Sequence, residues 1–151
     1  MVSIGDKAPD FSLPDSNGLT IRLKDLRGST VVLYFYPRDN TPGCTREACS
    51  FNEQLTAIRR KGAVVLGVSA DSVESHHRFS EHYGLRFPLL SDETRKVIKA
   101  YGVWKRKSLY GRSFMGIERT TFIIDEKGVV RGVFPKVRVD GHSDVIRKSL
   151  D

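Results

Sequence analysis

The sequence has very few cysteines and no cysteine or histidine pattern typical of a metal site. Only Cys44 and Cys49 occur among 151 residues, too few for a disulfide-stabilised scaffold, which a domain of this length does not need. No C-x-x-C pair is present, which argues against a dithiol reductase motif. The histidines show no ligand spacing to one another or to the cysteines, so we expect no zinc site; they are His76, His77, His82 and His142.

Long hydrophobic runs and a secretion signal are also lacking. The longest apolar run is far shorter than a membrane span, and the first residues, MVSIGDKAPDF, lack the basic start and apolar core of a signal peptide. The composition, 39% hydrophobic and 28% charged, is typical of a folded globular protein. We therefore expect a cytoplasmic protein without a membrane partner, in which residues 1–151 form a single domain.

Acidic residues are outnumbered by basic ones, 18 to 25, which gives a net charge of +7 and a pI of about 9.6. The basic residues are scattered, with clusters at 59–61 and 104–112. No helix-turn-helix, zinc-finger or RNP-like motif accompanies them, so we expect no specific nucleic-acid binding. A solvated surface, or attraction of an acidic partner, explains this charge better.

The apolar pattern predicts strands in two arrangements. Continuous β-rich apolar segments at 30–36 and 63–69 indicate strands that are buried on both faces, and 119–125 is interpreted as another buried strand. Turn residues predict a hairpin around 17–18 near the N-terminus and a second hairpin between 119–125 and 129–134.

Helices are expected between and after these strands, at 44–62, 71–84, 92–102 and after Asp140. The second of them would begin with a capping box formed by Asp71 and Glu74. His76 and His77 are interpreted as lying on its solvated face. Strands that alternate with helices indicate an α/β fold with helices on both faces of a mixed sheet.

The chemistry of the sequence is concentrated around Cys44. This cysteine follows a buried strand and lies at the start of the helix expected at 44–62, where unpaired N–H groups and the helix dipole favour a thiolate. Gly43 allows close approach of a ligand, Thr41 can direct its hydroxyl into the same pocket, and Pro37 can form a pocket wall. A thiolate in a small electropositive pocket suits attack on an electrophile such as a peroxide oxygen or a disulfide.

Cys49 lies five residues after Cys44, about 140° further round a helix. In an intact helix the two Cα atoms would be about 8–9 Å apart, beyond the roughly 7 Å limit for a disulfide. The pair can bond if the first helical turn unwinds, after oxidation of Cys44 to a sulfenic acid with which Cys49 condenses. The alternative is that Cys44 is a small apolar residue used for packing.

The stretch PRDNTPGCTREAC contains the pattern P-x-x-x-T-x-x-C at Pro37, Thr41 and Cys44. It resembles the active-site signature of peroxiredoxins, and the second cysteine five residues later resembles their Q, or bacterioferritin-comigratory-protein, type. The similarity extends almost end to end, because further segments resemble the family in the expected order: GDKAPDFSLPDSNG, LLSDE, YGVW and GIERTTFIID.

The resemblance implies a thioredoxin-like fold with an N-terminal β-hairpin extension and a thiol peroxidase that reduces hydrogen peroxide and organic hydroperoxides. Cys44 would be the peroxidatic cysteine and Cys49 the resolving one. Thr41 would hold the peroxide, Arg119 would lie against the peroxidatic sulfur, and Pro37 would form a pocket wall. A guanidinium keeps its charge, so it can stabilise a thiolate and orient a peroxide.

The resemblance also implies thioredoxin or a similar dithiol as the reductant, a monomer, and no metal, haem or flavin. Glu47 is interpreted only as a favourable charge near the helix start, and Trp104 as a packing residue at the pocket edge. Two other functions remain open at this point. One is a general thiol–disulfide oxidoreductase, and the other is a non-enzymatic basic binding module.

Overall fold

A five-stranded sheet with the strand order β5-β4-β3-β8-β9 forms the centre of the computed structural model, which describes residues 1–151. Its central strand β3 (Thr30–Phe35) is buried along its whole length. It pairs in parallel with β4 (Ala63–Ser69) and antiparallel with β8 (Thr120–Ile124). Both faces of these strands are covered, which is why their sequences are continuously apolar.

The sheet is completed by an edge strand on each side, β5 (Leu89–Ser91) and β9 (Val130–Phe134). Strand β5 is parallel to β4, and β9 is antiparallel to β8. The mixed sheet and the hairpin of β8 and β9 are therefore as predicted. The N-terminal hairpin is also confirmed, as β1 (Ser12–Pro14) paired with β2 (Thr20–Arg22), and a short 3-10 helix η1 (Leu23–Leu26) follows it.

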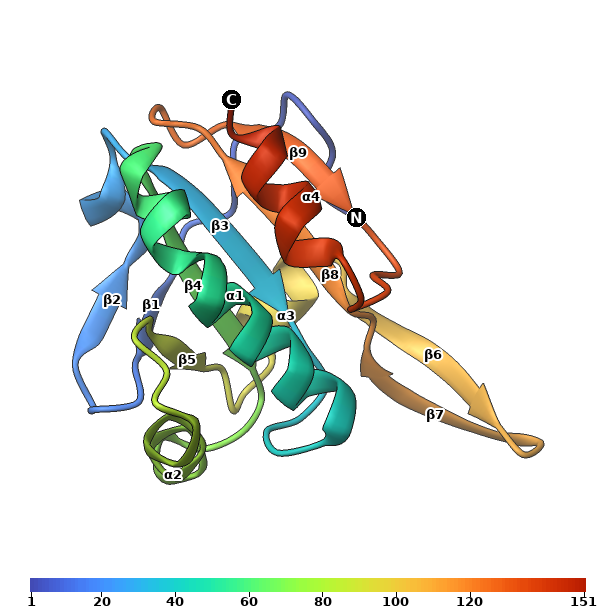
Figure 1. Cartoon of the computed structure of the whole chain (residues 1–151). Helices are drawn as coiled ribbons and strands as arrows, with labels where there is room; N and C mark the ends of the chain where they lie inside the picture. The colour runs from blue at the N-terminus through green and yellow to red at the C-terminus, as the bar shows by residue number, and fades with distance from the viewer.

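Helices cover both faces of the sheet (Figure 1). Successive side chains of β3 point to opposite faces, and they enter two separate apolar clusters. One cluster lies under α1 (Pro42–Arg60) and α4 (His142–Ser149), which pack side by side. The other lies under α3 (Lys96–Ala100) and the N-terminal segment. No helix is both long and apolar enough to cross a membrane.

Helix α2 (Val73–Tyr83) differs from the sequence prediction in its N-cap residue and in which of its side chains are buried. Its N-cap is Ser72, whose hydroxyl accepts a hydrogen bond from the N–H of Ser75 at 3.1 Å, so the predicted capping box is wrong. The Asp71 carboxylate instead accepts hydrogen bonds from the backbone N–H of Asp39 and the hydroxyl of Ser69. His76 is completely buried, although His77 is exposed as expected. The predicted end is confirmed, since Gly84 adopts the left-handed conformation there.

Two further elements depart from the prediction. Helix α3 is shorter than 92–102 because the segment before it is a turn, in which the Asp92 carboxylate accepts a hydrogen bond from the N–H of Ile98. The basic segment 104–112 belongs to an unpredicted hairpin of β6 (Trp104–Leu109) and β7 (Arg112–Ile117). Tyr110 and Gly111 both have positive φ at its turn, as a type I′ turn requires. The hairpin projects from the body of the protein (Figure 1).

Candidate active site

Cys44 lies in the first turn of α1, just beyond the end of the central strand. Thr41 is the N-cap and Pro42 is the first helical residue, where the missing N–H of proline costs nothing. The Cys44 side chain is buried and its thiol is free. The first-turn N–H groups have no partner within the helix, so they and the helix dipole favour a negative charge on this sulfur.

Arg119 brings a positive charge to the same sulfur from the residue that precedes β8. Its Nη2 donates a hydrogen bond to Cys44 Sγ at 3.3 Å. Burial by itself would lower the pKa of Arg119, but the nearby Glu47 carboxylate and Cys44 raise it above its usual value. The structure thus brings together two residues that are 75 positions apart in sequence, and the guanidinium remains charged beside the thiol.

Glu47 is a site residue that the sequence analysis underrated. It is almost completely buried, at 1% exposure, and its Oε1 accepts a hydrogen bond from Arg119 Nη1 at 2.6 Å. Its Oε2 has no hydrogen-bond partner. Burial raises the pKa of Glu47 to about 7, although the charge and hydrogen bond of Arg119 act in the opposite direction. The available signal was its position three residues after Cys44, on the same face of the helix.

An open cavity of about 700 Å³ reaches the N-terminus of α1, where the N-cap Thr41 lines it three residues before Cys44. Pro37 and Thr41 line it on one side, and Pro37 itself is exposed. The Thr41 hydroxyl donates a hydrogen bond to the carbonyl of Arg38 at 3.2 Å. Trp104 lies at the edge of the cavity. The Arg95 guanidinium lies over its indole ring, with Cζ 5.0 Å from the ring centroid, in keeping with a packing role for Trp104.

The projecting hairpin forms the opposite wall of this cavity, which the sequence analysis did not foresee. Its contribution is largely apolar and comes from Leu109, Phe114, Met115 and Ile117. Lys107 also lines the cavity, and burial together with the positive charge of Arg119 lowers its pKa. A cavity with an apolar wall and several cations at its rim can accept a peroxide that carries an organic group.

Cys49 is half-buried on the next turn of α1, and its thiol is free. Burial raises the pKa of Cys49, and the charge of Glu53 raises it further. The helix is continuous through both cysteines. The structure therefore does not bring the two thiols together, which is the separation that the sequence predicts for a reduced protein with an intact helix.

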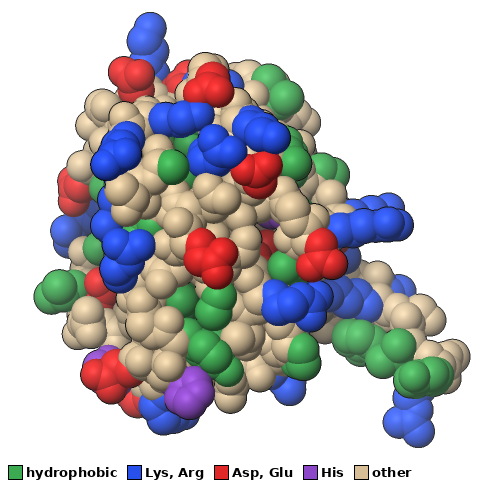
Figure 2. Space-filling view, in the orientation of Figure 1, with side chains coloured by type: hydrophobic (Ala, Val, Ile, Leu, Met, Phe, Trp, Pro, Cys, Tyr) green, Lys and Arg blue, Asp and Glu red, His purple; other side chains and the backbone are tan.

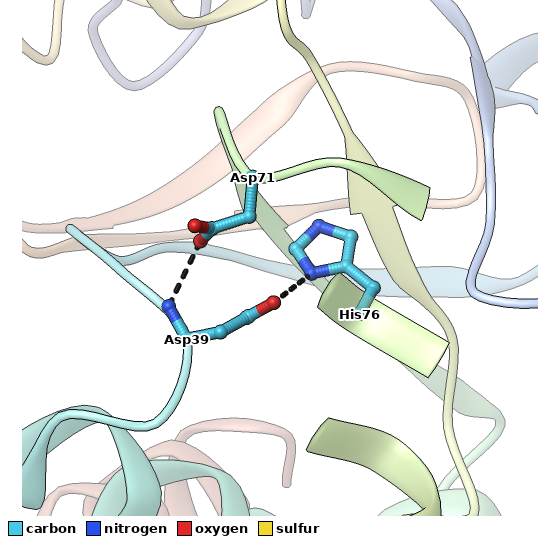
Figure 3. Close-up of side chains that lie close together, drawn as sticks. All are labelled: Asp39, Asp71 and His76. Carbon is cyan, nitrogen blue, oxygen red and sulfur yellow. Dashed lines mark hydrogen bonds and ion pairs between the residues drawn. The ribbon is translucent and has the colours of Figure 1, made fainter. Parts of the chain in front are cut away.

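A group of potential metal ligands, Asp39, Asp71 and His76, lies beside the loop that precedes α1 (Figure 3). Both carboxylate oxygens of Asp39 and both ring nitrogens of His76 are already hydrogen-bonded to protein groups. A cation would have to displace these bonds, so the group does not fit a metal site.

Comparison with known proteins places this geometry in a family. The AhpC/TSA family model matches residues 4–133. The peroxiredoxin Bcp of Bacillus subtilis is 46% identical over 141 residues, covering 93% of this chain and 90% of the relative. The peroxiredoxin Bcp of Escherichia coli is 43% identical over 142 residues, covering 94% and 91%.

Solved structures agree in both fold and sequence. A mutant of peroxiredoxin Q from Xylella fastidiosa matches with a TM-score of 0.95 at 38% identity, over 99% of this chain and 96% of that one. The Xanthomonas campestris bacterioferritin comigratory protein, in a structure concerned with its alkyl peroxide reduction activity, matches with a TM-score of 0.91 at 40% identity, over 99% and 96%. The expected thioredoxin-like fold is thereby confirmed, and the chain belongs to the AhpC/TSA family as a peroxiredoxin of the Bcp, or Q, type, a thiol peroxidase.

Proposed function

We propose that Cys44 is the peroxidatic cysteine of this thiol peroxidase. The observation that carries the proposal is the hydrogen bond from Arg119 Nη2 to Cys44 Sγ at the start of α1. The thiolate attacks the terminal oxygen of ROOH, the O–O bond breaks, and the departing alkoxide takes up a proton to give ROH. Cys44 becomes a sulfenic acid. Arg119 and the first-turn N–H groups stabilise the charge that develops during the attack.

The cavity supports a role for Thr41 in holding the peroxide and for Pro37 as a wall that restricts water. Both residues line the cavity at the N-terminus of α1. The substrates proposed are hydrogen peroxide and organic hydroperoxides. The apolar wall supplied by the hairpin suits the latter, and the Xanthomonas relative is described by its alkyl peroxide reduction activity.

Cys49 is the proposed resolving cysteine. Its thiol condenses with the Cys44 sulfenic acid, which forms a disulfide and releases water. This step requires the first turns of α1 to unwind, because the intact helix keeps the sulfurs apart. Thioredoxin or a similar dithiol protein then reduces the disulfide by thiol exchange. Both cysteines lie on one helix, so one chain can complete the cycle, which supports a monomer of one catalytic domain. A reducing compartment such as the cytoplasm keeps both thiols free.

A role in nucleic-acid binding has less support. In Figure 2 the Lys and Arg side chains are spread over the visible face with acidic side chains among them, and the projecting hairpin carries hydrophobic as well as basic side chains. No continuous basic stripe of the kind that follows a phosphate backbone is visible on this face.

The test follows the first turnover by stopped flow and mass spectrometry, with one equivalent of peroxide. The wild type should consume it and form a disulfide. Cys49→Ser should consume it at a similar rate but gain one oxygen atom and lose turnover with thioredoxin. Cys44→Ser should neither consume the peroxide nor form a disulfide. Retention of a tenth of the wild-type rate by Cys44→Ser would exclude Cys44 as the peroxidatic residue. Full thioredoxin-linked turnover by Cys49→Ser would exclude Cys49 as the resolving one.

A further inference from the structure

A buried polar cluster, formed by Tyr36, Asp39 and His76, lies behind the loop that leads into the active-site helix. The Tyr36 hydroxyl donates to Asp39 Oδ1 at 2.5 Å, and His76 Nδ1 lies 2.7 Å from Asp39 Oδ2. The Ser75 hydroxyl donates to the same Oδ2 at 2.8 Å. All three members of the Tyr36–Asp39–His76 cluster are at most 7% exposed.

Both ring nitrogens of His76 have polar partners in the folded protein. The carbonyl of Leu90 lies 3.0 Å from Nε2, and a carbonyl oxygen only accepts, so Nε2 carries a hydrogen. His76 Nδ1 lies against Asp39 and is also 3.4 Å from the Tyr36 hydroxyl, so the three side chains contact one another directly. Burial strengthens hydrogen bonds such as these.

The cluster acts on a short segment, because Tyr36 and Asp39 both belong to the loop between β3 and α1, whereas His76 belongs to α2. The backbone N–H of Asp39 donates to Asp71 Oδ2 at 2.8 Å, which gives the loop a second attachment (Figure 3). The next residue, Asn40, is held in the left-handed region at a φ of 62°. On either side of this attachment, Pro37 and Thr41 line the cavity.

We propose that the Tyr36–Asp39–His76 cluster is a positioning element for the peroxidase reaction. It holds the loop 37–41 in the conformation that forms the peroxide pocket. By doing so it restrains the unwinding of α1 that disulfide closure requires. The inference rests on the proposed function, since it assigns the cluster a role in the balance between the two steps of that cycle. Peroxide attack uses the conformation with an intact α1, whereas closure uses an unwound one.

Weakening the cluster should therefore affect the two steps differently. A hydrogen bond to a charged group typically shifts an equilibrium by about tenfold or more. The intact conformation of α1 is the predominant one. A tenfold shift of the equilibrium toward the unwound conformation therefore raises the small unwound population by about tenfold but lowers the large intact population far less. Disulfide closure should accelerate by about tenfold, while peroxide attack should remain the same or fall modestly.

The experiment measures both rate constants in the full chain with hydrogen peroxide, using the fluorescence of Trp104, the only tryptophan, and quenched mass spectrometry for the disulfide. Tyr36→Phe removes one hydroxyl with little change in packing. Asp39→Asn, which removes the charge, is the second variant. Tyr101→Phe is the matched control. Tyr101 is equally buried, but it lies in the apolar cluster on the other face of the sheet, and its hydroxyl donates a hydrogen bond to the carbonyl of Pro9.

The proposal requires faster closure in Tyr36→Phe and Asp39→Asn but not in Tyr101→Phe. It also requires loss of hydrogen-exchange protection over 37–46 in the first two variants only. It is overturned if closure keeps the wild-type rate or slows in both cluster variants, or if Tyr101→Phe accelerates it equally, which would indicate general destabilisation. Failure of the wild type itself to form a disulfide would contradict the proposed function instead, so the two failures are distinguishable.

Discussion

Replacing Glu47 by glutamine should remove a pH dependence of stability that originates in the active site. Glu47 is buried with one carboxylate oxygen unpartnered, and burial raises its pKa from the ordinary 4.5 to about 7. The folded state therefore binds a proton at this residue more tightly than the unfolded state does. The stability contributed by that proton is fully present below about pH 4.5 and is lost as the pH rises through about 7.

The size of the effect follows from the same shift. Between pH 5 and pH 8 the wild type should lose about 2.5 kcal/mol of unfolding free energy through Glu47, at about 1.4 kcal/mol for each pKa unit. Glu47→Gln has nothing to titrate at this position, so the difference in stability between wild type and variant should change by that amount. Loss of the ion pair with Arg119 alters this difference at pH 8 without reversing the trend.

Urea unfolding of both proteins at several pH values between 5 and 8 measures the difference directly. Glu53→Gln is the matched control, since Glu53 is exposed on the same helix and its substitution should leave the pH dependence unaltered. Parallel curves for the wild type and Glu47→Gln would show that Glu47 ionises as it does in the unfolded chain. Such a result would refute the argument that its burial is costly.

Three further results are expected. Arg119→Ala should slow peroxide attack by at least tenfold, because the sulfur loses a fixed positive charge 3.3 Å away, and it should also lower stability, because the buried Glu47 loses its partner; an unchanged attack rate would remove Arg119 from the site. Oxidation should reduce hydrogen-exchange protection over 42–52, since closing the Cys44–Cys49 bond requires unwinding; equal protection in both redox states would contradict it. Burial and the charge of Arg119 lower the pKa of His142 to about 4, so the wild type should lose stability as the pH falls from about 6.5 to 4. In urea unfolding His142→Gln should lose less stability over this range, and an equal loss in both proteins would count against the lowered pKa.

Features that depend on local patterns could be predicted from the sequence. The apolar face of α1, the buried central strands and the left-handed cap at Gly84 all follow from spacing and residue type. The position of Cys44 at a helix start followed from the buried strand that ends before it. Arg119 was placed through family resemblance alone, because nothing local links it to a cysteine 75 residues away.

Features that depend on residues distant in the sequence could not be predicted. A glutamate in a first helical turn is usually solvated, and only Arg119, from the segment before β8, makes burial of Glu47 tolerable. The solvated position predicted for His76 was wrong for the same reason, since Asp39 and the Leu90 carbonyl come from other elements. The β6–β7 hairpin was missed because its strands project from the sheet, which leaves them without the apolar alternation of a half-buried strand.

The position of Glu47 between the two cysteines links its protonation to the catalytic cycle. Unwinding of the first turns of α1 carries Glu47 away from Arg119 and into water, where its ordinary pKa is restored. In the proposed cycle the protonated carboxyl group therefore favours the intact helix, in which Cys44 would attack peroxide, and the ionised one favours the unwound segment, in which Cys44 would reach Cys49. By linkage, disulfide closure should accelerate as the pH rises toward about 7, the pKa of Glu47 in the intact helix. Glu47→Gln should retain only the dependence that ionisation of the Cys49 thiol imposes, so an identical pH profile of closure in the two proteins would exclude this coupling.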